Sequence, residues 1–130
     1  MKKALSFILI LMIIISTGCT SCRKSVYYNY DEMIEKVVKV EIVEVSNTKG
    51  DKTKVLKTLD ESLIDDFLYD LCQIEFVVPW GRGSLRGTSF CVYYNDVEYE
   101  IINYSYNRIN GVLTTCDREE FEALVNKYYP

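Results

Sequence analysis

The chain of 130 residues contains no histidine, only two prolines and a single tryptophan. Histidine is the commonest general base and a common zinc ligand, so its absence excludes Ser-His-Asp and Cys-His catalysis and argues against a zinc site. Basic residues are also few, since 15 Lys and Arg stand against 19 Asp and Glu and leave a net charge of −4. No basic stripe exists that would displace counterions, so no nucleic-acid partner is expected.

The rest of the composition is that of a globular chain, with 48% apolar and 26% charged residues. These fractions exclude intrinsic disorder, collagen and coiled coil as descriptions of the whole chain. A chain of this length allows one domain with a short appendage.

The first residues have the three-part layout of a secretory signal. Met1-Lys2-Lys3 is a basic start, Ala4–Ile15 is apolar except for one serine, and small residues precede Cys19. An uncut membrane anchor over Ala4–Cys22 is the alternative, because nineteen uncharged residues just suffice to span a bilayer. The strongly apolar part covers only about a dozen residues, which favours a cleaved signal.

The four residues Ser16-Thr17-Gly18-Cys19 resemble the lipobox of bacterial lipoproteins. In that family a small residue precedes a cysteine that is lipidated and becomes the mature N-terminus. The resemblance implies a signal peptide over residues 1–18, lipidation of Cys19 and attachment to the outer side of the cell membrane. Ser16 departs from the Leu-like residue usual at that position, and Cys22 is a poorer second candidate. A secreted form without lipid remains a further alternative.

Removal of residues 1–18 takes away two lysines, so 15 − 2 = 13 basic and 19 acidic residues remain and the net charge is −6. Residues 19–34 are interpreted as the lipidated N-terminus and a short tether, and residues 35–130 as the extracytoplasmic domain. A dozen flexible residues reach only about 20 Å, so the domain is expected close to the membrane. Docking of the tether's three tyrosines on the domain is the alternative, and the sequence leaves both options open.

The first half of the domain predicts two strands and a helix. Val37–Val45 alternates like a half-buried strand with a bulge near Ile42, and Lys52–Lys57 follows a turn over 47–51. Thr58–Glu61 matches a capping box, and the helix behind it has one apolar stripe, formed by Leu63, Ile64, Phe67, Leu68 and Leu71. Asp66 and Asp70 lie one turn apart, where a solvated helix face is favoured over a metal site.

A hairpin is predicted over Thr88–Tyr94 and Val97–Tyr104, with Asn95-Asp96 as a two-residue turn. This turn pairs three sets of apolar residues: Tyr94 with Val97, Val92 with Tyr99, and Phe90 with Ile101. The opposite face of the hairpin then carries Cys91, Tyr93, Glu98, Glu100, Ile102 and Tyr104.

The second half also contains a tight turn at Asn110-Gly111 and a terminal helix that starts at Asp117. The apolar stripe of this helix consists of Phe121, Leu124, Val125 and Tyr128. The predicted fold class is therefore α+β: an antiparallel β-sheet with two α-helices packed on one face, in the order ββαββββα, preceded by a signal-peptide helix. The helices should cover the Phe90 and Val92 face, and the other face should be open or covered by the tether.

The runs VLKTLDESLIDDFLYDL, CVYYNDVEYEIINYSY and CDREEFEALVNKYY resemble, in their spacing, small uncharacterised lipoproteins of Gram-positive bacteria. This resemblance implies a class of protein and no activity. A Cys72–Cys116 bridge between the two helices is one option, and small buried thiols are the other. The glycine- and arginine-rich loop Pro79–Gly87 is either an anion cradle or a connection that needs positive backbone angles.

The expected function is a non-catalytic binding module. Tyr93, Glu98, Glu100 and Tyr104 are the predicted contacts of an open sheet face with an envelope protein or glycan, because tyrosine combines a flat apolar ring with a polar tip. No catalytic residue, cofactor or metal is assigned. The alternatives are a carboxylate-dependent glycan hydrolase at Glu98 and Glu100, and an accessory or inhibitor protein that inserts the Trp80–Gly87 loop into a partner.

Overall fold

A computed structural model describes residues 24–46, 52–81 and 86–130, so the predicted signal peptide, Cys19 and the 47–51 turn lie outside the described residues. The elements are β1 (Ser25–Val26), α2 (Tyr30–Lys36), β2 (Lys39–Val45), β3 (Lys52–Thr58), α3 (Glu61–Cys72), β4 (Phe76–Val77), β5 (Gly87–Tyr93), β6 (Tyr99–Ile102), β7 (Asn107–Ile109), β8 (Val112–Thr114) and α4 (Arg118–Tyr128).

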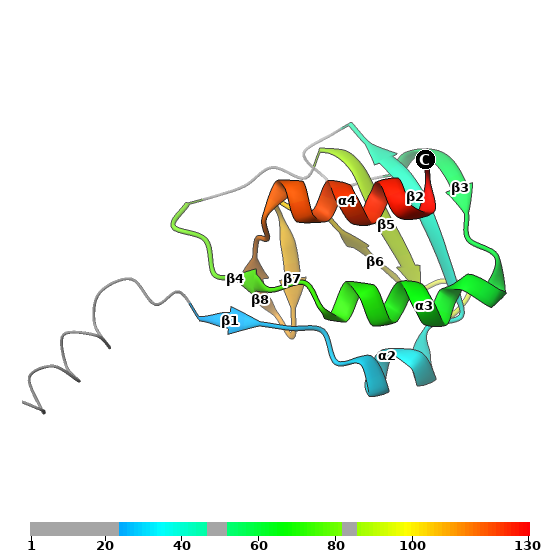
Figure 1. The fold of residues 1–130 in the computed structure, drawn as a ribbon, viewed down its shortest axis with the longest axis horizontal. Helices are drawn as coiled ribbons and strands as arrows, with labels where there is room; N and C mark the ends of the chain where they lie inside the picture. The colour runs from blue at the N-terminus through cyan, green and yellow to red at the C-terminus, as the bar shows by residue number, and fades with distance from the viewer. Residues whose placement is uncertain (1–23, 47–51, 82–85) are drawn as a thin grey trace, which may run out of the picture.

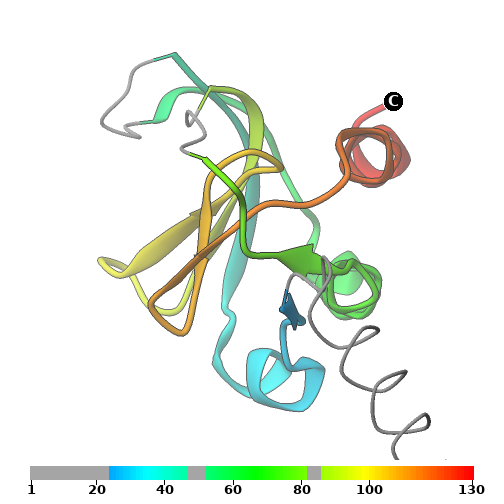
Figure 2. The same cartoon turned by 90° about the vertical axis from the view of Figure 1, so that its left-hand side faces the viewer.

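The α+β prediction is confirmed: antiparallel strands form the sheets, and α3 and α4 pack on one face (Figure 2). The central sheet has the order β3-β2-β5-β6, and β1-β4 and β7-β8 form two small sheets beside it. Among the described residues five strands, β4 to β8, separate α3 from α4, where the predicted order had four. The two helices run antiparallel across the sheet (Figure 1).

Both helices pack largely as their sequences predict, but only α4 begins at the predicted cap. Asp117 caps α4 by accepting a hydrogen bond from the backbone N–H of Glu120, whereas α3 is capped by Asp60 and not by Thr58. Thr58 is the last residue of β3, so the N-cap of α3 lies two residues later than the predicted capping box places it. The buried stripes match the prediction except that Leu63 is exposed.

Aromatic rings join the sheet to both helices in the main core. The ring of Phe90 on β5 lies 4.7 Å from that of Phe67 on α3 and 5.3 Å from that of Phe121 on α4. Val40, Ile42 and Val92 complete the sheet side of this core. Such ring pairs contribute about 0.5–1.5 kcal/mol each beyond the area they bury.

Strand β2 is buried on both faces. Val40 and Ile42 face the helices, while Val43 and Val45 join Cys91 and Tyr93 in a second buried cluster on the other face. The bulge expected near Ile42 is present as a register shift between Ile42 and Val43 in the pairing with β3, although β2 pairs with β5 without interruption.

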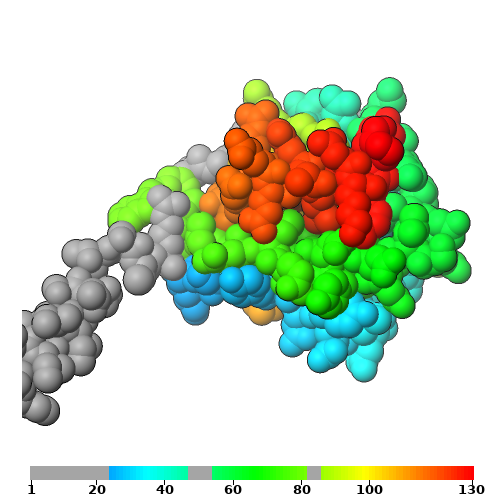
Figure 3. All heavy atoms as spheres, in the orientation of Figure 1, coloured from blue at the N-terminus to red at the C-terminus, as the bar shows by residue number. Residues whose placement is uncertain are grey.

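The segment expected to be a tether belongs to the domain from at least Ser25 onward. Strand β1 pairs with β4, Asn29 caps α2, and Tyr28 and Met33 are buried in the main core. In the space-filling view this segment lies directly against α3 (Figure 3). Of the two options for the tyrosines, docking is observed for Tyr28 and Tyr30, whereas Tyr27 is 51% exposed. The domain boundary expected at residue 35 is too late.

Candidate functional site

A groove of about 680 Å³ opens where the N-terminal segment meets the end of the β5–β6 hairpin. The groove is lined by Tyr27, Tyr28 and Glu32 from the N-terminal segment, by Tyr94, Glu98 and Glu100 from the hairpin, and by Arg108 beside the β7–β8 turn, among others.

The hairpin positions its two glutamates through a three-residue turn. Asn95 Oδ1 accepts hydrogen bonds from the backbone N–H groups of Val97 and Glu98, at 2.8 and 2.7 Å. Tyr94 N–H donates to the Glu98 carbonyl, so Val97 lies in the turn rather than opposite Tyr94. Asparagine favours such turns because its side chain replaces a backbone acceptor.

This turn changes the register of β6 by one residue from the predicted one. Val92 pairs with Glu100 and Phe90 with Ile102, so the predicted pairing of Val92 with Tyr99 is wrong. A one-residue shift moves every side chain of a strand to the opposite face. Glu100 therefore lies on the helix-covered face, and Tyr99 lies opposite Tyr93 on the other.

Glu100 is the centre of a hydrogen-bond network at the bottom of the groove. Its carboxylate accepts from the Tyr94 hydroxyl at 2.8 Å and from the Tyr28 hydroxyl at 3.1 Å. The Tyr28 oxygen in turn accepts from Asn107 Nδ2 at 2.6 Å. The network thus joins the N-terminal segment both to the β5–β6 hairpin and to β7.

Burial raises the pKa of Glu100 above its ordinary value, and the hydrogen bonds from Tyr94 and Tyr28 offset part of that rise. Burial, followed by the charge of Glu100, raises the pKa of both tyrosines. The two phenols therefore stay protonated and remain donors to the carboxylate over the physiological pH range.

The ionisable groups of the groove are predominantly acidic. Four glutamates line it, Glu32, Glu35, Glu98 and Glu100, against Lys36 and Arg108, an excess of 4 − 2 = 2 negative charges. Lys36 is already paired with Glu32 at 2.7 Å within α2. No salt bridge within the described part of the chain joins Glu100 to a cation.

The four predicted contact residues do not share one face. Glu98 and Glu100 both line the groove. Tyr93 is only 7% exposed and belongs to the second buried cluster, so it is not on an open face. Tyr104 packs against Phe121, with the Arg118 guanidinium 5.4 Å from its ring, and lines a separate pocket of about 410 Å³.

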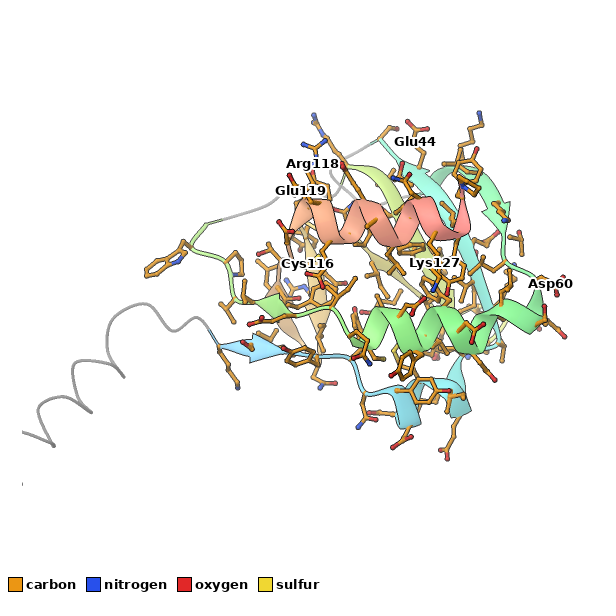
Figure 4. All side chains as sticks on the ribbon, viewed as in Figure 1. Glu44, Asp60, Cys116, Arg118, Glu119 and Lys127 are labelled. Atoms are coloured by element: carbon orange, nitrogen blue, oxygen red, sulfur yellow. The ribbon has the colours of Figure 1, made fainter. Side chains whose placement is uncertain are left out.

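The other residues singled out in the sequence have structural roles or lie partly outside the described ranges. Cys72 and Cys116 are free thiols, so no Cys72–Cys116 bridge is present. Asp70 accepts hydrogen bonds from Lys127 and Tyr128 of α4, and the Lys127 side chain extends from α4 toward α3 (Figure 4). Residues 82–85 of the glycine-rich loop lie outside the described residues.

A metal-binding arrangement is not found in the described ranges, where no three Cys, Asp or Glu side chains come close enough to hold an ion. The same ranges contain no helix of the length and apolar character needed to cross a membrane. Comparison with protein-family models, curated proteins and solved structures finds no match to this chain.

Sequence reasoning missed Tyr27, Tyr28, Tyr94 and Asn107 as residues at or beneath the groove. The signal for Tyr94 was Asn95, whose turn-forming side chain favours the longer loop and the shifted register. The signal for Tyr28 was the closely spaced tyrosines of the supposed tether, since solvated linkers are poor in aromatic residues. No local pattern points to Asn107, because its role depends on the approach of the N-terminal segment.

Proposed function

We propose that this chain is a lipid-anchored protein of the outer side of the cell membrane that binds an envelope protein or glycan in the groove and catalyses no reaction. The observation that carries the binding role is the groove itself, in which tyrosines and glutamates from the N-terminal segment and the hairpin converge.

The groove combines an accessible ring with a fixed interior. Tyr27 is 51% exposed at its edge and offers a flat apolar surface, which suits sugars and peptides. Tyr28 and Tyr94 are held by hydrogen bonds to Glu100, so a ligand meets a preorganised wall and little side-chain entropy is lost on binding.

The anchor is supported by the signal-like residues 1–18 and the lipobox-like Cys19. Because Ser25 is already paired in β1, six residue steps separate Cys19 from the folded domain. At about 3.5 Å per step the chain spans at most about 20 Å, so lipidation would hold the domain against the membrane surface. Intact-mass measurement of the membrane-extracted protein should give the chain without residues 1–18 plus acyl groups. A mass that retains Met1 would refute the anchor.

Binding is tested by a pair of tyrosine variants of the full-length protein in non-ionic detergent, mixed with solubilised envelope material. Tyr27→Ala removes an exposed ring at the groove, and Tyr69→Ala removes a ring of similar exposure (55%) on α3, outside it. Reduced retention of one defined envelope component by Tyr27→Ala alone supports the groove. Equal retention by both variants and the wild type contradicts it.

A carboxylate-dependent glycan hydrolase is the second candidate, because Glu98 and Glu100 both line the groove and burial raises the pKa of Glu100. Glu98 directly precedes β6, two residues of extended backbone span about 6.5–7 Å, and paired carboxylates carry out glycoside hydrolysis. The double variant Glu98→Gln, Glu100→Gln separates the two functions: loss of glycan turnover with retained binding favours the enzyme.

A further inference from the structure

Within the described ranges the carboxylate of Glu100 has only neutral hydrogen-bond partners. Both of its hydrogen-bond donors are tyrosine hydroxyls, and among the described residues the salt bridges involve other carboxylates. A partly desolvated charge that lacks a counter-charge is costly to hold, and a cation brought to it recovers part of that cost.

The surroundings of Glu100 favour a cation over an anion or a neutral group. The groove has two negative charges in excess, and the rings of Tyr27, Tyr28 and Tyr94 belong to its wall. Aromatic faces attract ammonium and guanidinium groups, so rings and carboxylates favour the same ligand.

Apolar side chains also line the groove beside these charges. Val38 is exposed there, and Met33 and Ile109 form buried parts of the wall. An aliphatic stem that ends in a cation matches this combination, because lysine and arginine lay their methylene groups along apolar surface while the charged end reaches a polar partner. The volume of about 680 Å³ falls in the range of about 300–1,000 Å³ that accommodates ligands much larger than one amino group, so residues flanking the basic side chain also fit.

We propose that the groove binds a lysine or arginine side chain of a partner polypeptide, with its cationic end on Glu100 between the hydroxyls of Tyr28 and Tyr94 and its stem along Val38. This inference rests on the proposed binding function and commits it to a protein ligand rather than a glycan.

The test uses the full-length, isotope-labelled protein in non-ionic detergent micelles, titrated with two short blocked peptides that are followed by NMR. One peptide carries a central lysine among alanines, and the other carries Nε-acetyl-lysine, which has the same stem without the charge. The lysine peptide should bind about tenfold more tightly, the factor expected of a partly desolvated charge pair with an aromatic wall. Its largest shifts should lie at the backbone amides of Tyr94, Glu98 and Glu100.

Two charge-neutralising variants assign the effect to Glu100. Glu100→Gln should remove the preference for the lysine peptide, whereas Glu119→Gln removes an equal charge at an exposed position of α4 outside the groove and should retain it. Where Glu100→Gln fails to fold, Glu98→Gln serves instead and should reduce the preference. An equal affinity for the two peptides, or a preference that survives Glu100→Gln, overturns the inference.

A neutral N-acetylglucosamine tetramer distinguishes this failure from failure of the proposed function. One outcome is that the tetramer binds, Tyr27→Ala weakens tetramer binding, and neither peptide binds. This outcome refutes the cationic ligand but retains the proposed binding function. Where peptides, tetramer and envelope material all fail to bind, both proposals are refuted.

Discussion

The hydroxyl of Tyr28 offers the sharpest test of how the N-terminal segment is held. Tyr28→Phe keeps the ring, which packs edge-to-face on Phe76 at 5.4 Å, and removes only the oxygen that joins Glu100 to Asn107. Asn107 is 1% exposed, and its Oδ1 already has no hydrogen-bond partner among the described residues. The substitution therefore leaves a whole buried amide unpaired.

The expected loss of stability follows from these two hydrogen bonds. An unpaired buried amide costs about 1–3 kcal/mol, and the bond to the half-buried Glu100 contributes about 1 kcal/mol more, since water replaces it in part. The sum of about 2–4 kcal/mol corresponds to a decrease in Tm of roughly 10–20 °C for a domain of this size.

Urea unfolding of the full-length protein in detergent, followed by far-UV circular dichroism, measures this loss. Tyr69→Phe is the control, because Tyr69 is 55% exposed and its hydroxyl makes no hydrogen bond within the part of the chain that the structure describes. A Tyr28→Phe variant within about 0.5 kcal/mol of the wild type, the range of ordinary surface substitutions, would mean that the segment is a loose tether.

Three further predictions concern other parts of the fold. Burial holds the pKa of Glu100 above its ordinary value of 4.5. The wild type should therefore lose stability relative to Glu100→Gln as the pH rises through and above that value. An unchanged difference in the free energy of unfolding between pH 4 and 7 would contradict this. Burial alone would raise the pKa of Asp70, but hydrogen bonds from α4, one of them from Lys127, hold it below 3.8. Asp70→Asn should thus cost about 1–2 kcal/mol at pH 7, and the difference should shrink as the pH falls through and below 3.8; a difference that persists at pH 2 would refute the pairing. Gly111 has φ +79° with open space at its Cβ position, so Gly111→Ala should lower the free energy of unfolding in urea by about 1 kcal/mol. Gly81→Ala, where no positive φ is required, should cause no measurable loss. Equal effects of the two substitutions would refute backbone strain at Gly111.

The helices were predictable because local signals and tertiary packing agree there. The apolar stripe around Phe67 reflects the burial of one face of α3, and the cap at Asp117 satisfies the free amides at the start of α4. Both requirements are local, so both are visible in the sequence. The Asn110-Gly111 turn was predictable for the same reason, since both residues adopt positive φ between β7 and β8.

The hairpin register was not predictable from apolar pairing alone. Pairing apolar residues across the strands favoured Tyr99 opposite Val92, whereas the structure places the polar Glu100 there. Glu100 is accommodated because Tyr28, from a segment 72 residues away, supplies a hydroxyl. A polar residue on the core side of a strand depends on a distant partner, which hydrophobic alternation does not reveal, so the candidate site was only half found.

The central claim is that the groove at Tyr27 meets a partner outside the cell, and crosslinking in intact cells tests it most directly. A photoreactive phenylalanine at position 27 should give one defined crosslinked product, and the same residue at position 69, equally exposed but outside the groove, should not. Identical products at both positions, or none at position 27, would contradict the account.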